Sequence, residues 1–264
     1  MVRRGRTLHE MPDSRTHRGP HPQDGQLFAD EMLPKLRRAA GDLNWLLSRD
    51  YPLDSALKLV GDRFELVARQ RTAVRRSCCS DRQLVLRQAK MIADDRVEYG
   101  EVLYIDGYNV LTTVEAALAE GVILAGRDGC YRDMASMHGN YRKVAETLPA
   151  LELIGLTIAG QSFRECVWFL DSPVSNSGRL AGIIREVAAA NDWTWRVELV
   201  TDPDPILSEC RQAVATADSL ILDNCRSWWN LAKKVIEDRV SSVFLVDLAE
   251  NSIEDNEGNR GNPG

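Results

Sequence analysis

The stretch Glu101–Thr113, EVLYIDGYNVLTT, decides the fold of this chain. Its apolar run Val102–Ile105 is typical of a short buried strand, and it ends abruptly in Asp-Gly-Tyr-Asn. In open α/β sheets, ligands bind just beyond the C-terminal ends of the strands. We therefore expect this strand to bring the carboxylate of Asp106 and the amide of Asn109 to a binding edge. The alternative is an ordinary turn, because Asp, Gly and Asn all favour turns.

Three later apolar runs also end in or lead into an aspartate: VWFLD at Val167–Asp171, AVATAD at Ala213–Asp218 and VFLVD at Val243–Asp247. A parallel strand that is buried on both faces rarely contains an acid, so acids at strand ends indicate a shared rim. Clustered carboxylates repel one another unless a cation is present, and carboxylate oxygens suit Mg²⁺ or Mn²⁺. We therefore predict a Mg²⁺ or Mn²⁺ site held by Asp106, Asp171, Asp218 and Asp247. The alternative is four unrelated aspartates that cap helices.

Strand-like and helix-like segments alternate from Val102 to Asp247, which predicts a parallel sheet covered by helices on both faces. The further predicted strands are Cys166–Asp171, Trp195–Val200, Val214–Thr216 and Val243–Asp247. The predicted helical regions are Val114–Glu120, Tyr131–Ala159 with an interruption near Pro149, a helix that Ser175–Gly178 caps, Ile206–Ala213 and most of Leu220–Val240. We expect the adjacent Trp228 and Trp229 to pack in the core, with base stacking as the alternative.

The preceding part of the chain has leucines at helical spacing, a proline near a helix start at Pro34 and a candidate N-cap at Ser80. We predict a small all-α domain over residues 27–97, followed by the α/β domain over residues 98–250. Residues 1–26 and 251–264 contain few apolar residues, so we expect flexible tails there.

The composition argues against a membrane-spanning, secreted or zinc-binding protein. The chain has 264 residues, 44% of them hydrophobic, without an apolar run that approaches the roughly 20 residues needed to span a bilayer. The start of the chain has no apolar signal segment, so we expect a cytoplasmic protein. Six cysteines without zinc-type spacing are expected to be reduced and mostly buried.

The net charge of −6 does not suggest a general nucleic-acid binder, but the local charge is uneven. The helical region between Arg69 and Lys90 contains seven basic residues against one acid: Arg69, Arg71, Arg75, Arg76, Arg82, Arg87 and Lys90 against Asp81. We expect Arg71, Arg75 and Arg76 to contact an RNA backbone. A solvated helix surface is the alternative.

Two further segments are candidates for phosphate binding. The polar block from Arg127 to Lys143 contributes Arg127, Arg132, Arg142 and Lys143, while Asp128 or Asp133 would add a ligand. A solvated loop and helix face explains the same block equally well. The segment after Asp171 offers hydroxyls and free backbone N–H groups at a helix start, with Ser175, Ser177 and Arg179. Capping of the helix alone is the alternative explanation for Ser175 or Ser177. His138 is a candidate for proton transfer, although a lone helical histidine is more often structural.

Four motifs of this chain resemble the successive acidic signatures of NYN-type, PIN-like ribonucleases. They are IDGYNV at Ile105–Val110, FLD at Phe169–Asp171, TAD at Thr216–Asp218 and LVD at Leu245–Asp247. The resemblance covers roughly residues 102–248 and implies metal-dependent RNA cleavage on a PIN/NYN-like α/β fold. It assigns the family's metal-binding acids to the four aspartates named above and its amide to Asn109, and we take these five residues as the catalytic set.

The chain as a whole also resembles an uncharacterised bacterial and archaeal two-domain family of the domain-of-unknown-function 434 type. The segments that carry this resemblance are RGPHPQDGQLF, LKLVGDRFELVARQRTAVRRS, RDGCYRDMASMHGNYRK and DSPVSNSGRLA. This family implies no activity.

The function that the sequence predicts is therefore a metal-dependent endoribonuclease that hydrolyses phosphodiester bonds. The alternative is a non-catalytic adaptor on the same fold that binds RNA or protein. A phosphohydrolase acting on small substrates is a weaker third candidate, since a DxDx[TV] signature, a P-loop and a GxGxxG after the first strand are all absent.

Overall fold

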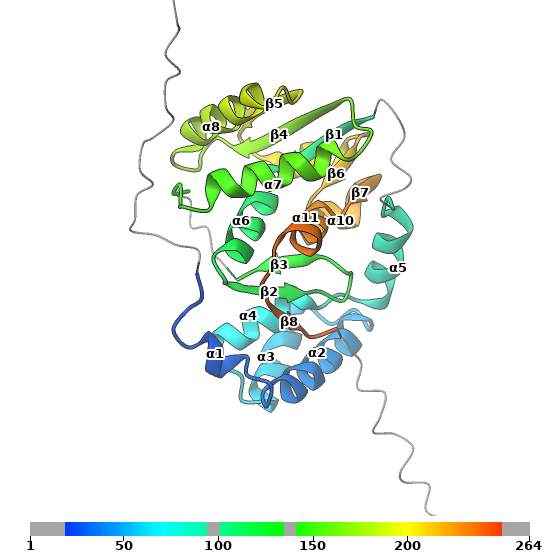
Figure 1. The fold of residues 1–264 in the computed structure, drawn as a ribbon. Helices are drawn as coiled ribbons and strands as arrows, with labels where there is room; N and C mark the ends of the chain where they lie inside the picture. Colours follow the sequence, from blue (N-terminus) through cyan, green and yellow to red (C-terminus); the bar gives the residue numbers. More distant parts are fainter. Residues whose placement is uncertain (1–18, 94–100, 135–140, 250–264) are drawn as a thin grey trace, which may run out of the picture.

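The computed structural model describes residues 19–93, 101–134 and 141–249. Its larger sheet has five parallel strands in the order β5-β4-β1-β6-β7 and occupies the upper half of Figure 1. The strands are β1 (Val102–Asp106), β4 (Glu165–Asp171), β5 (Trp195–Val200), β6 (Ala213–Ala215) and β7 (Ser227–Trp229). The first four agree with predicted strands to within one residue, whereas β7 lies inside a region that we predicted to be mostly helix.

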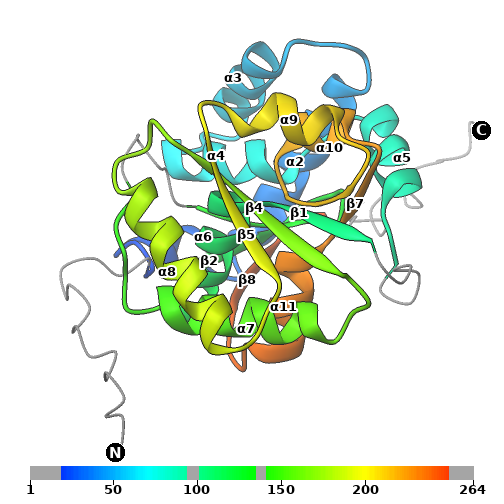
Figure 2. The same ribbon diagram turned by 90° about the horizontal axis from the view of Figure 1, so that it is seen from above.

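The helices that flank this sheet divide between its two faces, as the view in Figure 2 shows. They are α6 (Gly107–Leu118), α7 (Thr147–Ala159), α8 (Ser177–Ala190), α9 (Pro203–Glu209), α10 (Ser219–Asn224) and α11 (Leu231–Arg239). Leu103 and Ile105 of β1 pack in a core with α6, α7, α8 and α11. Tyr104 and the β4 residues Val167 and Phe169 pack with α9 and α10 on the opposite face. This two-sided burial confirms the predicted α/β class.

A second sheet of three strands was not predicted. It contains β2 (Val122–Ala125), β3 (Tyr131–Asp133) and β8 (Phe244–Asp247), with β2 in the centre. Strand β2 pairs antiparallel with β3 and parallel with β8. The prediction of helix from Tyr131 was wrong, because Tyr131–Asp133 gains strand pairing from β2. Prediction of a final strand was right, but this strand belongs to the second sheet.

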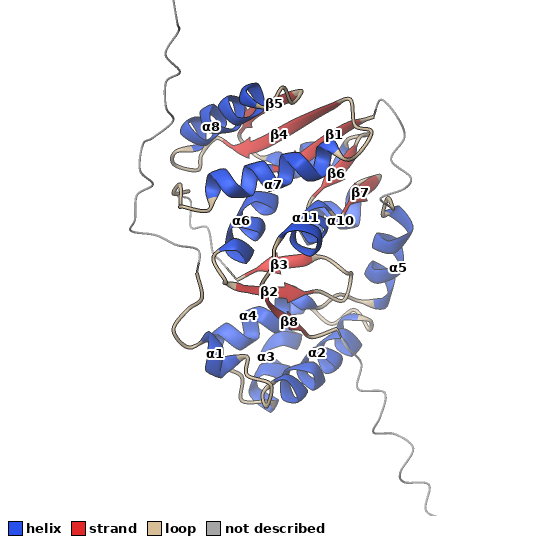
Figure 3. Ribbon diagram, viewed as in Figure 1, coloured by secondary structure: helices blue, strands red, loops and turns tan. Residues whose placement is uncertain are grey.

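Helices from the N-terminal part of the chain cover the lower face of the second sheet (Figure 3). They are α1 (Asp24–Leu27), α2 (Leu33–Leu47), α3 (Leu53–Arg63) and α4 (Ala68–Ser77). Leu36 and Leu43 of α2 and Val74 of α4 share one core with Leu124 of β2 and Val246 of β8. The residues that we predicted to form a separate all-α domain therefore complete a core together with the α/β part.

Two of the N-terminal helices begin at positions that the local sequence explains. Pro34 lies in the first turn of α2, and the Ser80 hydroxyl accepts a hydrogen bond from the backbone N–H of Gln83 at the start of α5 (Asp81–Lys90). Helix α1 lies partly within the predicted flexible tail. Its Asp24 is fully buried and paired with Arg69. Residues 1–18 of that tail, and the C-terminal tail from residue 251, lie outside the described residues.

None of the helices in the described ranges is both long enough and apolar enough to cross a membrane.

Candidate functional site

The C-terminal end of β1 lies where the strand order of the larger sheet reverses. From β1 the chain continues to β4 and β5 on one side and then returns to β6 and β7 on the other. In open α/β sheets such a reversal leaves a crevice beyond the strand ends, where ligands bind. Asp106 ends β1, and the segment Thr216–Asp218 follows β6 directly beside it. The two motifs that the sequence singled out therefore meet at this crevice.

Side-chain hydrogen bonds join these two motifs. The Thr216 hydroxyl donates to the Asp106 carboxylate at 2.7 Å and accepts from the backbone N–H of Asp218 at 3.0 Å. The Asn109 side-chain oxygen accepts from the backbone N–H of Ala217 at 2.8 Å. Asp218 in turn accepts from the N–H groups at the start of α10, so it caps that helix. Asn109 thus holds the loop opposite.

Gly107 is required by the close approach of α6 to strand β4. A Cβ atom at this position would lie 2.8 Å from the backbone oxygen of Phe169 and 2.6 Å from the Leu170 side chain. Both distances are shorter than those of ordinary packing, and the backbone oxygen has no freedom to move aside. The glycine of the Asp-Gly-Tyr-Asn motif therefore lets the helix begin directly at Asp106.

Two acids that the sequence analysis did not single out, Asp202 and Asp204, follow β5 at the same edge of the sheet. The Asp202 side chain accepts a hydrogen bond from the backbone N–H of Asp204 at 3.1 Å at the start of α9. Burial raises the pKa of Asp204, and the negative charges of Asp218, Asp202 and Asp171 raise this pKa further. The same rule, an acid directly after an apolar run, would have found them in TDPD after Trp195–Val200.

Burial also raises the pKa of the half-buried Asp106 to about 7. The Thr216 hydroxyl opposes this shift by bonding the carboxylate, while the charges of Asp218 and Asp204 add to it. The pKa of Asp171 is raised as well, by burial and by Asp202. Asp106, Asp171, Asp204 and Asp218 therefore share one negative field that originates from the ends of four neighbouring strands.

Asp247 does not belong to this group. It ends β8 in the second sheet, where it pairs in register with Ala125, and it does not line the cavity described below. Its carboxylate accepts a hydrogen bond from the backbone N–H of Ala249, and its backbone oxygen accepts one from Arg37. The expectation that it shares the rim with Asp106 was wrong, because strand pairing and not chain order decides which acids meet.

Within the described ranges, no three His, Cys, Asp or Glu side chains lie close enough together to hold one metal ion. Mg²⁺ needs no such cage, because it retains several waters and binds through one or two carboxylates together with substrate phosphates. Burial first, and then the charges of neighbouring acids, raise the pKa of Asp106 and of Asp204, and a cation would relieve the repulsion between these charges. The oxygen donors at this rim thus fit a hard divalent cation.

A cavity of about 670 Å³ opens at this rim and extends to the N-terminal helices. Its acidic residues are Asp106, Asp133, Asp204 and Asp218, and its arginines are Arg75, Arg76, Arg87 and Arg132. Tyr108 also lines the cavity, and its buried hydroxyl has no hydrogen-bond partner among the described residues. The cavity therefore places acids beside arginines contributed by α4, α5 and β3.

Most arginines of the predicted basic patch are paired with acids and do not form an open cationic surface. The pairs are Arg69 with Asp24, Arg71 with Asp62, Arg75 with Asp54, Arg76 with Asp133, and Arg87 with both Asp128 and Asp223. Arg71 is also bound to the backbone oxygen of Leu66 and does not line the cavity. Arg75 and Arg76 do line it, so the two adjacent residues of α4 are the part of this prediction that reaches the rim.

The other predicted phosphate-binding residues lie away from this cavity, except Arg132. Arg127 pairs with Asp81. Lys143 is half-buried, whereas Arg142, Ser175 and Arg179 are exposed. Ser177 is buried, and its hydroxyl donates to the backbone oxygen of Ser172. Helix α8 begins at Ser177 with Asn176 in a left-handed conformation and without a side-chain cap. His138 lies outside the described residues. Trp228 and Trp229 are buried in β7, which confirms the prediction that they pack in the core.

Comparison with known proteins places the chain in a family. The sequence profile of a domain of unknown function, DUF5616, matches residues 62–234, which include α4, α5 and the whole five-stranded sheet. The chain is 32% identical over 206 residues to an uncharacterized protein of Methanocaldococcus jannaschii, and the match covers 76% of this chain and 97% of that protein. No solved structure matches. The expectation of an uncharacterised family with archaeal members is confirmed: this chain belongs to the DUF5616 family.

Proposed function

We propose that this protein is a metal-dependent endoribonuclease that hydrolyses phosphodiester bonds at the rim formed by β1, β4, β5 and β6. The observation that carries the proposal is that Asp106, Asp171, Asp204 and Asp218 lie at the ends of four neighbouring strands. The charges of Asp218 and Asp204 add to the burial that raises the pKa of Asp106. A bound cation would relieve the cost in stability that ionised acids in such a cluster impose. The resemblance of IDGYNV and TAD to PIN-like ribonucleases points to the same chemistry.

In this proposal Asp106 and Asp218 hold the metal ion, with Asp204 and Asp171 around it. A bound Mg²⁺ or Mn²⁺ supplies two things, a water of lowered pKa and neutralisation of phosphate charge. Thr216 and Asn109 keep the two acidic segments at a constant separation through the hydrogen bonds described above. Their contribution is orientation of the carboxylates before the substrate arrives.

Of the arginines that line the cavity, Arg75 is assigned to the substrate. Arg75 is half exposed, and its partner Asp54 is more exposed still, so the ion pair between them contributes little and is easily exchanged for a phosphate. The guanidinium group matches the geometry of a phosphate with two parallel N–H donors. A cavity with acids and arginines side by side suits an RNA phosphate together with its metal ion.

The experiment is Mn²⁺-dependent cleavage of mixed cellular RNA by the pure protein, with Asp106→Asn beside it. Asp238→Asn is the matched control, since it removes one carboxylate from an exposed ion pair on α11. We expect cleavage by the wild type and the control, and a loss of roughly a hundredfold or more in Asp106→Asn, whose fold is verified by circular dichroism. Equal cleavage by all three proteins would refute the assignment of the site.

The same experiment separates the nuclease from the non-catalytic adaptor. Salt-sensitive RNA binding without cleavage by the wild type, at any Mn²⁺ or Mg²⁺ concentration, would favour the adaptor. Absence of both cleavage and binding would refute RNA as the substrate.

A further inference from the structure

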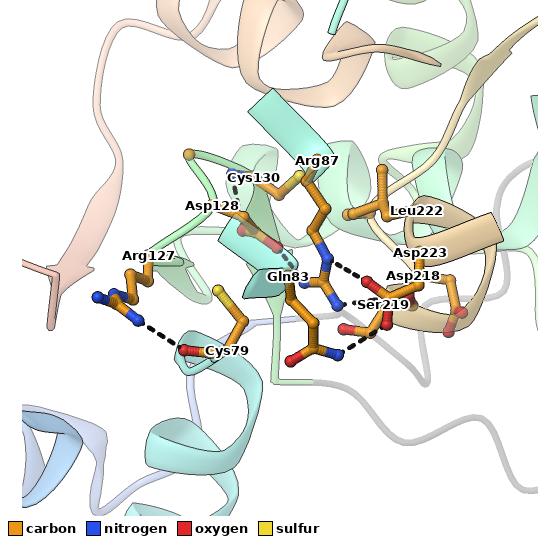
Figure 4. Close-up of polar contacts among 12 residues, drawn as sticks. Cys79, Gln83, Arg87, Arg127, Asp128, Cys130, Asp218, Ser219, Leu222 and Asp223 are labelled. Carbon is orange, nitrogen blue, oxygen red and sulfur yellow. Dashed lines mark hydrogen bonds and ion pairs between the residues drawn. The ribbon is translucent and has the colours of Figure 1, made fainter. Parts of the chain in front are cut away.

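Arg87 and Asp128 form a buried ion pair between helix α5 and the loop that joins β2 to β3 (Figure 4). Their side chains are 1% and 2% exposed, and Arg87 Nη1 lies 2.6 Å from Asp128 Oδ2. Arg132 binds the same carboxylate with two parallel bonds of 2.8 and 2.7 Å. Burial alone would raise the pKa of Asp128, but the two guanidinium groups, Arg132 first, lower it to about 2. One carboxylate thus holds two arginines in place.

The remaining N–H groups of these two arginines reach the segment that carries Asp218. Arg132 Nε donates to the backbone oxygen of Ala217 at 2.8 Å, and Arg87 Nη2 donates to that of Ser219 at 3.4 Å. The two contacts lie on either side of Asp218. The guanidinium fork is planar and rigid, so fixing one edge of it on Asp128 fixes the direction of the donor on the other edge.

Helix α5 binds α10 through further side chains. Asp223 of α10 accepts from Arg87 Nε at 2.7 Å and from Gln83 Nε2 at 2.7 Å. Lys90 donates to the backbone oxygen of Asp223 at 2.7 Å, next to the end of α10. Arg87 also accepts, through its own backbone oxygen, a bond from the indole N–H of Trp228 in β7. Helix α5 is therefore attached to α10 at its first residue, Ser219, and near its end, at Asp223.

Gly126 leaves the space that this arrangement needs. A Cβ atom on Gly126 would lie 2.4 Å from Arg132 Nη1 and 2.8 Å from Asp128 Oδ1. The loop closes behind the pair with Gly129 at a φ of +82°, a conformation that favours glycine. The Gly-Arg-Asp-Gly segment, for which the sequence allowed a phosphate clamp or a solvated loop, is instead a cradle for the buried carboxylate.

We propose that Asp128 is a positioning residue for the rim acids. By holding Arg87 and Arg132 it fixes the segment from Thr216 to Ser219, and so keeps the Thr216 hydroxyl on Asp106. Partners outside the immediate site commonly orient the groups within it, and losing them changes affinity or rate while the overall fold remains. The positioning role of Asp128 follows from its contacts with Arg87 and Arg132, whereas the effect on RNA cleavage rests on the proposed function.

The proposal also changes the role of the α5 region. The sequence assigned the helical region that contains α5 to RNA binding, but α5 is a structural part of the site. Arg87 cannot bind a ligand unless its ion pair with Asp128 is broken.

The test is hydrogen exchange of backbone amides by NMR in the metal-free full-length protein. The informative amides are those of Ala217 and Asp218, which donate to Asn109 and to Thr216. In Asp128→Asn we expect their protection to fall roughly tenfold or more, with little change in the amides of β5. Asp81→Asn is the matched control, since it removes a carboxylate from the exposed pair with Arg127, next to Asp128, and should change neither group.

Arg132→Lys repeats the test with the positive charge retained, because lysine does not reproduce the fork that joins Asp128 to Ala217. If Asp128→Asn does not fold, the exchange of Ala217 and Asp218 in Arg132→Lys tests the positioning role by itself. Unchanged protection at Ala217 and Asp218 would overturn the proposal. A uniform fall across all strands would also overturn it, because it would show general destabilisation without a local role.

Cleavage kinetics form a second readout. We expect Asp128→Asn to lower kcat by roughly tenfold or more with little change in KM for RNA, because no substrate contact is removed. If the wild type cleaves no RNA while the exchange result holds, the proposed function fails and the positioning role stands. Normal kcat together with local loss of protection would overturn the catalytic part of the inference.

Discussion

The Thr216 hydroxyl donates a hydrogen bond of 2.7 Å to the carboxylate of Asp106, across a sequence separation of 110 residues. This contact joins the ends of β1 and β6, between which the strand order reverses. The carboxylate that it supports is also the one whose pKa burial raises to about 7. Removal of charge at Asp106 therefore has a consequence that can be measured without any substrate.

Asp106→Asn is expected to stabilise the metal-free protein at pH 8 but not at pH 4. The unfolded chain releases this proton near pH 4, whereas the folded protein keeps it until about pH 7. The stabilising contribution of protonated Asp106 is thus complete below about pH 4 and is lost as the pH rises to about 7. Asparagine does not ionise, so the variant avoids the loss of stability that the wild type undergoes when Asp106 ionises. At pH 8 this gain is at most a few kcal/mol in the free energy of unfolding. Urea denaturation with a chelator present measures it, and an equal gain at both pH values would contradict the prediction.

Asp204→Asn is expected to lower the pKa of Asp106. The negative charge of Asp204 is one of those that raise this pKa, so its removal favours ionisation of Asp106. Carboxyl-carbon NMR titration of Asp106 measures the shift directly. Asp247→Asn serves as the comparison and should leave the titration unchanged, because Asp247 ends a strand of the other sheet. A shift with Asp247→Asn alone would contradict the placement of both acids.

Arg75→Gln is expected to weaken RNA binding and to reduce its dependence on salt. Each phosphate contact to a single strand contributes about 0.7 to the slope of log K against log salt concentration, so one lost contact lowers the slope by about that amount. Fluorescence anisotropy with a labelled RNA at several salt concentrations measures the slope. Arg63→Gln is the matched control, since Arg63 forms a similar exposed pair with Asp42 and does not line the cavity. Equal slopes for both variants would remove Arg75 from the RNA site.

Gly107→Ala is expected to destabilise the protein, whereas Gly41→Ala stabilises it. The new methyl group at Gly107 meets the backbone oxygen of Phe169 at 2.8 Å, which overpacks the junction by roughly 1–3 kcal/mol. Gly41 lies on the exposed face of α2 with open space around it, so alanine gains roughly 0.5–1 kcal/mol of helix propensity. The midpoints of urea denaturation, compared at an unchanged m-value, measure both changes. A Gly107→Ala variant as stable as the wild type would show that α6 has room to shift.

The local features of the fold were accessible to sequence reasoning. The apolar runs of β1, β4 and β5 are long enough to be recognised as buried strands, and Ser80 marks the start of α5 because a hydroxyl cap has a local sequence pattern. Strands β3 and β7 have only three residues each, which is too short for a period of two to appear. Their strand conformation comes from pairing with β2 and β6.

Sequence reasoning found only some of the site's residues, because pairing between distant strands decides which strand ends meet. The sequence by itself determined that Asp106, Asp171 and Asp218 follow buried strands, and therefore that these acids lie at strand ends. Only the tertiary structure decided that β8 joins another sheet, so that Asp204 and not Asp247 completes the rim. Pairing of strands and burial of Arg87 against Asp128 depend on contacts between distant residues, which a local pattern of apolar and charged side chains does not encode.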